Sequence, residues 1–204
     1  MKPFPLSFPP LNVILKDIEE LNLNITETQL ELFGIFAGIL LDRSERINLI
    51  GPRERNRLWG RHFLESIQYS RLLDKEQTVV DIGSGNGFPG MILAIMGVRM
   101  ILLAPRSKRY LVLDSSASAL GLDNCITVPL RLEDFNPEEG VRQFVARSVA
   151  PPASLLAGIG KAAGKGSTLV YRQPEISIMK NVAGYMELSC PPLDRGGFLV
   201  QYRV

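Results

Sequence analysis

The chain has 204 residues, of which 46% are hydrophobic and 22% charged, proportions typical of a globular protein rather than a disordered or fibrous one. Its net charge of +2 does not by itself indicate a nucleic-acid partner, so any such site must come from local clusters of basic residues. The two cysteines fit no metal-ligand spacing, and we expect no metal. The uncharged run 32–41 is shorter than the roughly 20 residues that cross a bilayer. With no signal-peptide pattern at its start, the sequence predicts a soluble protein of the cytoplasm that does not associate with membranes. We expect it to be a monomer.

The first part of the chain, residues 1–74, is predicted to be a helical extension. Residues 11–21 carry apolar side chains at helical spacing. The segment from Thr26 to Gln29 has the form of a capping box, in which Thr26 is the N-cap and Gln29 its partner. Apolar side chains then recur every three or four positions up to Leu40. We therefore expect a second helix to begin at this box.

Arginines crowd the segment between Asp42 and Arg71, with Trp59 and His62 among them. One interpretation is a solvated helix surface whose basic and acidic side chains form local ion pairs. The other is an electrostatic surface for phosphate, because the planar guanidinium fork suits phosphate oxygens. The number of charges does not decide between them. His62, the only histidine, either contacts RNA or has a structural role.

From residue 75 to residue 204, short apolar runs alternate with helical patterns. Such alternation predicts an α/β Rossmann-like fold, with a mostly parallel sheet and helices on both faces. The two parts are expected to form one compact unit. The expected strands are 78–81, 100–103, 125–128, 141–149, 167–172, 185–189 and 198–204, the last two as an antiparallel hairpin or edge. The expected helices are 89–96, 107–120, 151–163 and a weaker one at 176–182.

The first expected strand ends in the pattern Asp81-x-Gly83-x-Gly85-x-Gly87. Glycines let a turn adopt positive φ and let the backbone approach a ligand closely. Pro89 suits the first turn of a following helix, where its missing N–H has no partner to lose. A strand, a glycine turn and a helix N-terminus together are typical of a nucleotide-binding βαβ unit.

The acid before the glycines bears on which ligand this turn would bind. A carboxylate at Asp81 would repel a pyrophosphate on the same turn, but it suits a cationic ligand or a hydrogen bond that holds the turn itself. S-adenosylmethionine carries a sulfonium and an ammonium and no phosphate, so the pattern favours it over NAD. A glycine turn that binds nothing is a further alternative.

Related folds usually place an acid about 20 residues further on, at the end of the second strand, where it accepts hydrogen bonds from ribose hydroxyls. This chain has Leu103-Ala104-Pro105 there, followed by Arg106, Ser107 and Lys108. A hydrogen bond to a charged group is worth roughly 1.5–3 kcal/mol. The sequence therefore predicts a cofactor site that is weakened at its ribose, rebuilt there, or completed by RNA.

Taken together, these motifs resemble, in order along the chain, segments of the bacterial small-subunit ribosomal RNA methyltransferase G family, also called glucose-inhibited division protein B. Each segment alone is a weak signal, but their order makes the resemblance specific as far as about Val149, and it continues more faintly to the end. The segments are 46–50, 61–66, the glycine loop 81–90, the pair Lys108-Arg109, 131–135 and 146–148.

The resemblance implies a Rossmann-like methyltransferase with a helical N-terminal extension. It would transfer a methyl group from S-adenosylmethionine to N7 of a guanine in 16S rRNA, with the rRNA or the small ribosomal subunit as partner. The residues that match the family's cofactor site are Asp81, Gly83, Ser84, Gly85, Gly87, Phe88, Leu132, Glu133 and Arg147, of which Arg147 is also the candidate catalytic residue. The candidate RNA-binding residues are Arg55, Arg57, Arg61, His62, Lys108, Arg109 and Arg172.

Structural alternatives exist for these residues: turn glycines, a solvated Glu133, and an Arg147 paired with a nearby acid. The chain also departs from the family at two places. Ala104 stands where an acid is expected, and Tyr171-Arg172-Gln173 stands where the family has a lysine and a glycine. Two other functions therefore remain open: a relative that binds RNA or ribosome precursors without methylating, and a methyltransferase for another substrate.

Overall fold

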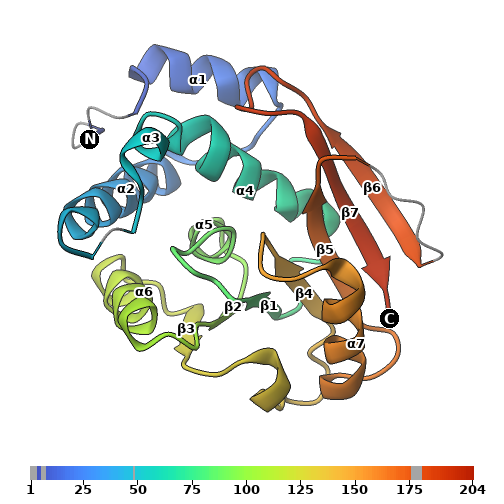
Figure 1. The fold of residues 1–204 in the computed structure, drawn as a ribbon. Helices are drawn as coiled ribbons and strands as arrows, with labels where there is room; N and C mark the ends of the chain where they lie inside the picture. The colour runs from blue at the N-terminus through green and yellow to red at the C-terminus, as the bar shows by residue number, and fades with distance from the viewer. Residues whose placement is uncertain (1–3, 6–7, 48, 176–180) are drawn as a thin grey trace.

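Figure 1 shows the fold in a computed structural model, which describes residues 4–5, 8–47, 49–175 and 181–204. The chain begins with helices and continues as alternating strands and helices. The helices are α1 (Leu11–Glu20), α2 (Glu27–Ile47), α3 (Pro52–Arg55), the π-helix η1 (Leu58–Leu64), α4 (Glu65–Gln68), the 3-10 turn η2 (Tyr69–Leu72), α5 (Gly90–Ile95), α6 (Ser107–Ala119), the 3-10 turn η3 (Leu132–Asp134) and α7 (Pro152–Ala162). The strands are β1 (Val79–Ile82), β2 (Met100–Leu103), β3 (Cys125–Val128), β4 (Gln143–Ala146), β5 (Thr168–Gln173), β6 (Val182–Leu188) and β7 (Gly197–Arg203).

These strands form one sheet in the order β3-β2-β1-β4-β5-β7-β6. Strands β1 to β5 are parallel, and β7 runs antiparallel between β5 and β6. Ile82 at the end of β1 lies in register with Leu103 of β2 and Ala146 of β4. The residues after these strands therefore emerge side by side at one edge of the sheet, which is where α/β proteins bind ligands.

Alternate side chains of β1 enter two different cores, as the two-residue period of a strand requires. Val79 packs into the larger core with the N-terminal helices, α5 and α6. Val80 packs into the smaller core, where α7 supplies Leu155, Leu156 and Ile159. Helices thus cover both faces, and the predicted fold class is confirmed (Figure 1).

The N-terminal helices pack directly on the glycine loop of the sheet. The predicted capping box is present: the amide of Gln29 donates to Thr26 Oγ1 at 3.2 Å, and the amide of Thr26 donates to Gln29 Oε1 at 3.0 Å. Phe36 of α2 and Phe63 of η1 place their rings 5.8 and 5.4 Å from that of Phe88 in the loop. The extension therefore helps to hold the loop in place.

Several boundaries differ from those expected. The fourth strand is Gln143–Ala146 rather than 141–149, because Ser148 adopts a φ of 56°, which ends an extended conformation. The helix expected at 176–182 lies largely outside the described residues, and its last residue, Val182, begins β6. The division into two parts at residue 74 stays a prediction. Among the described residues, no helix has the length and apolar character that would span a bilayer.

Candidate cofactor and RNA site

The glycine loop between β1 and α5 has the backbone conformation that its sequence predicts. Gly83, Gly85 and Gly87 have φ values of 67°, 56° and 92°, in the left-handed region that favours glycine. A Cβ on Gly87 would also lie 2.6 Å from Met91 Cγ and 2.9 Å from Phe36 Cζ. Glycine at this position is therefore required by both the backbone angle and the packing.

Asp81 lies beneath this loop and is only 1% exposed. Its Oδ2 accepts a hydrogen bond from the amide of Gly90 at 3.0 Å, and its carbonyl accepts one from Ser84 Oγ at 3.0 Å. Burial raises the pKa of Asp81 to about 6, and the Gly90 hydrogen bond opposes this rise without cancelling it. The carboxylate thus holds the turn, as one of the two interpretations of this acid predicts.

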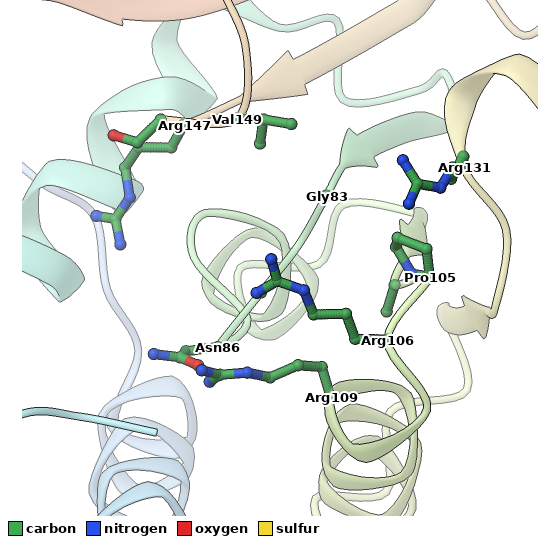
Figure 2. Close-up of a pocket in the computed structure, with 11 residues that line it drawn as sticks. Gly83, Asn86, Pro105, Arg106, Arg109, Arg131, Arg147 and Val149 are labelled. Atoms are coloured by element: carbon green, nitrogen blue, oxygen red, sulfur yellow. The ribbon is translucent and has the colours of Figure 1, made fainter. Parts of the chain in front are cut away.

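A cavity of about 520 Å³ opens at the carboxyl ends of β1, β2 and β4, above the loop (Figure 2). It is bounded on one side by the loop and Arg147, and on the other by the segments that follow β2 and β3. Its lining consists of Gly83, Gly85, Asn86, Ala104, Pro105, Arg106, Arg109, Arg131, Arg147, Ser148 and Val149.

Four arginines line this cavity, and its described lining contains no acidic side chain. Arg106 and Arg131 extend into the cavity from the side of Pro105, and Arg109 extends towards it from α6 (Figure 2). Asn86 Nδ2 donates to the carbonyl of Leu49 at 2.5 Å. The wall formed after β2 and β3 is therefore cationic.

Arg147, on the other side of the cavity, is held by four groups. Its Nη1 donates to the carbonyl of Arg61 at 3.3 Å. Its Nη2 donates to His62 Nδ1 at 2.8 Å, its Nη1 lies 3.4 Å from Glu65 Oε1, and its guanidinium carbon lies 5.2 Å from the centre of the Phe88 ring. Burial and the charge of Arg147 lower the pKa of His62 to about 4, although Glu54 opposes the shift. His62 is therefore neutral at pH 7 and bears no charge that would attract phosphate.

Glu65 lies behind Arg147 and is only 1% exposed. Besides Arg147, it pairs with Arg172 at 3.3 Å and with Arg195 at 3.2 Å. Arg172 also donates to the carbonyl of Gly196 at 2.7 Å. A single buried carboxylate of α4 thus joins the residue after β4, the strand β5 and the segment before β7. It also engages the guanidinium of Arg172, which we had expected to contact phosphate.

The arginines of the N-terminal extension show the local ion pairs that the alternative interpretation predicts. Arg57 donates to both carboxylate oxygens of Asp194, at 3.0 and 2.6 Å. Arg61 pairs with Glu54 at 3.2 Å. Lys108 is exposed beside the cavity, whereas Arg55 has a buried Nε without a hydrogen-bond partner in the described part of the chain. A role of these residues in RNA binding stays a prediction.

The sequence located the cavity but only part of its wall. Of the predicted cofactor residues, Gly83, Gly85 and Arg147 line it. Asp81, Ser84, Gly87 and Phe88 are buried under or beside the loop, Leu132 packs towards α7, and Glu133 is exposed. Ala104, Pro105 and Arg106, which the sequence places at the ribose end of the site, also line it. The lining residues not predicted are Asn86, Arg131, Ser148 and Val149, and since each follows a parallel strand, the rule that ligands bind at carboxyl ends would have found them.

S-adenosylmethionine fits one half of this cavity better than the other. The glycine turn leaves the backbone open to a close ligand, and Asp81 has a buried Oδ1 that accepts no hydrogen bond from the described residues. The ribose side does not fit as well, because Ala104 offers no carboxylate and Arg106 follows it closely. The residues therefore suit the methionine half and leave the ribose half without its usual acceptor.

The strand order, the glycine turn and the cavity above it define a Rossmann-like fold of the S-adenosylmethionine-dependent methyltransferase class. A tRNA (m1A58) methyltransferase from Aquifex aeolicus shares the fold with a TM-score of 0.51 and 17% identity, over 68% of this chain and 67% of that one. An RNA methyltransferase from Salinibacter ruber, in complex with S-adenosyl-L-homocysteine, has a TM-score of 0.53 and 12% identity, over 70% and 89%.

Within this class, the chain belongs to the rRNA small subunit methyltransferase G family, whose sequence model matches residues 29–186. The ribosomal RNA small subunit methyltransferase G of Clavibacter sepedonicus is 38% identical over 134 residues, which cover 61% of this chain and 63% of the relative. The protein of the same name from Beutenbergia cavernae is 31% identical over 167 residues, 81% of this chain and 76% of the relative. The predicted family is thereby confirmed.

Proposed function

We propose that this chain transfers a methyl group from S-adenosylmethionine to N7 of a guanine in 16S rRNA. The observation that carries the proposal is the glycine turn of this family, placed at the carboxyl end of β1 and facing a cavity large enough for a cofactor. Relatives that bear the name ribosomal RNA small subunit methyltransferase G support an RNA substrate. We further propose the rRNA within the small subunit as partner, and a monomer acting in the cytoplasm.

The proposed cofactor contacts follow from the position of the loop. The backbone of Gly83, Ser84, Gly85 and Gly87 would border the methionine half, and Asp81 Oδ1 would accept a hydrogen bond from its ammonium. When bound, the cofactor would supply a methyl group activated by a sulfonium. On the opposite side, the segment with Leu132 and Glu133 would flank the adenine.

The chain's own residues are suited to a reaction that needs no proton removed. Guanine N7 carries a free lone pair on the major-groove edge of the base. A general base is therefore unnecessary, and the neutral His62 bonded to Arg147 is consistent with that. Catalysis would come from positioning and from electrostatics, with Arg147 fixed over Phe88 at the cavity wall.

The proposed RNA surface lies beside the cavity rather than along the whole extension. Lys108 is exposed at the N-terminus of α6 and Arg109 lies at the cavity wall, so both are placed to meet a phosphate of a bound RNA. Arg55, Arg57, Arg61, His62 and Arg172 would contribute less, since most of them are already bound to other groups.

Transfer of a labelled methyl group from S-adenosylmethionine to small ribosomal subunits tests this function. The subunits come from cells that lack the gene, so that the target guanine is unmodified. Gly83→Val should abolish transfer, because its side chain would meet Val149, whereas Gly97→Ala, far from the cavity, should not. Labelled N7-methylguanine in 16S rRNA supports the proposal, and transfer to no ribosomal RNA contradicts it.

A second candidate is a family member that binds RNA without methylating it. Ala104 and the cationic cavity wall favour this candidate, because they remove the ribose acceptor and replace it with positive charge. In the same assay it predicts retention of ribosomal RNA by the protein with no transfer of label.

A further inference from the structure

The cavity wall after β2 has the charge opposite to the one expected for a ribose with free hydroxyls. In dinucleotide-binding folds, an acid at the end of the second strand accepts from the ribose 2′-hydroxyl, and an arginine near that position accommodates a 2′-phosphate instead. Here Ala104 lies in the cavity wall where the acid would stand, and Arg106 follows two residues later with its guanidinium in the cavity (Figure 2). The wall thus carries an arginine in place of the acid, the feature that accompanies a phosphate on the ribose in dinucleotide-binding folds.

The arginines of this wall differ from the others near the site in how they pair with acidic side chains. Arg147 pairs with Glu65, and Arg57 pairs with Asp194. Within the described residues, by contrast, Arg106, Arg109 and Arg131 form no ion pair, and Arg109 has a buried Nη1 without a hydrogen-bond partner. These guanidinium groups thus retain donors for an anion.

Two features of the surroundings strengthen the attraction of this wall for an anion. Burial lowers the pKa of Arg109, and the charge of Arg106 lowers it further because the two cations repel each other. The N-terminus of α6, which begins at Ser107, adds the positive end of a helix dipole at the same place. A phosphate placed here would relieve the repulsion and accept from several donors at once.

We propose that this cavity binds a free nucleoside monophosphate, with the phosphate on the ribose held by Arg106 and Arg131 at the wall after β2 and β3. The sheet edge and the glycine loop supply the nucleoside site, and the arginines supply the specificity for the phosphorylated form. This ligand would occupy the volume that S-adenosylmethionine needs and would therefore compete with it. The proposal goes beyond methyl transfer and does not depend on it.

Isothermal titration calorimetry at constant ionic strength tests this proposal with adenosine, the 2′-, 3′- and 5′-monophosphates of adenosine, and inorganic phosphate as probes. At least one monophosphate should bind ten times more tightly than adenosine and than inorganic phosphate. Arg106→Ala and Arg131→Ala should each weaken that binding about tenfold, the loss expected for one charge-assisted hydrogen bond. Arg203→Ala, an exposed arginine on β7, is the matched control and should have no effect.

A further variant should change the affinities for the two ligands in opposite directions. Ala104→Asp restores the missing acid, so it should weaken binding of the monophosphate and strengthen binding of S-adenosylmethionine. Circular dichroism confirms that each variant is folded; if Ala104→Asp is not, the two arginine variants carry the test alone.

Three results would overturn the proposal: no monophosphate binds at millimolar concentration, adenosine or inorganic phosphate binds as tightly, or the arginine variants bind as well as the parent. The methyl-transfer assay separates this failure from failure of the proposed function. A protein that methylates 16S rRNA but ignores nucleotides refutes only this inference, and one that binds nucleotides but transfers no methyl group refutes only the proposed activity.

Discussion

Arg147 donates from Nη2 to His62 Nδ1 at 2.8 Å, and this contact fixes the protonation of the only histidine in the chain. A guanidinium has no acceptor, so Nδ1 must be the unprotonated nitrogen. The proton therefore lies on Nε2, which donates to Glu54 Oε2 at 3.1 Å. Protonation of His62 would break one of the contacts that hold Arg147 at the cavity wall.

This arrangement predicts that His62 lowers the free energy of unfolding of the protein in acid. Its pKa is about 4 in the folded protein, below the ordinary 6.5, so the unfolded chain binds the proton more readily between these two values. The stabilising contribution is complete above pH 6.5 and is lost as the pH falls towards 4. Between pH 7 and pH 4.5, the parent should lose roughly 2–3 kcal/mol more of its unfolding free energy than His62→Gln. Urea denaturation at both pH values measures this, and equal losses would contradict the assignment.

Glu65→Gln should be among the most destabilising polar substitutions in the protein. It would leave Arg147 and Arg172 buried or partly buried without their carboxylate, at a cost of roughly 3–5 kcal/mol. Glu54→Gln is the control, because Glu54 also pairs with basic side chains but is partly exposed, and its loss should cost less than about 1 kcal/mol. Chemical denaturation compares the two variants. Similar small losses would mean that the Glu65 cluster contributes no more than surface ion pairs.

Gly87→Ala and Gly97→Ala separate packing from backbone strain in the glycine loop. The two glycines have nearly the same φ, 92° and 91°, but only Gly87 is crowded, by Met91 and Phe36. Both variants should lose about 1–2 kcal/mol from the backbone angle, and Gly87→Ala should lose about 1–3 kcal/mol more from overpacking. Thermal unfolding measures the difference. If the two melting temperatures fall equally, the loop has room that the structure does not show.

The salt dependence of RNA binding should distinguish paired from unpaired cations. Lys108→Ala should reduce the slope of log affinity against log salt concentration by about one, since each phosphate contact contributes roughly that much. Arg57→Ala should change it much less, because Asp194 already neutralises Arg57. Filter binding of 16S rRNA over a range of KCl concentrations measures both slopes. An equal change in both would show that the Arg57–Asp194 pair opens to bind RNA.

Local sequence signals were sufficient for most elements of this fold. The capping box at Thr26, the glycine turn after Asp81 and the strand Met100–Leu103 each depend on neighbours a few residues away, and each was predicted. The insertion of β7 between β5 and β6 was not, because side-chain alternation does not specify which strand lies next to which.

The site shows the same limit. The contacts of Glu65 join residues more than 80 positions apart in the sequence, so no local pattern could reveal them. The π-helix Leu58–Leu64, which carries His62, was likewise expected only as a helical stretch. Such π-helical segments are often found at functional sites, and this one places His62 within reach of Arg147.

Methylation of guanine N7 in 16S rRNA is tested by mapping N7-methylguanine in that RNA from cells with and without the gene. Reduction and strand scission at N7-methylguanine locate the modified nucleotide. We predict one site that is modified in the parent, unmodified in the deletion strain, and restored by the parent gene but not by Gly83→Val. An identical map in the parent and deletion strains would contradict the proposed function.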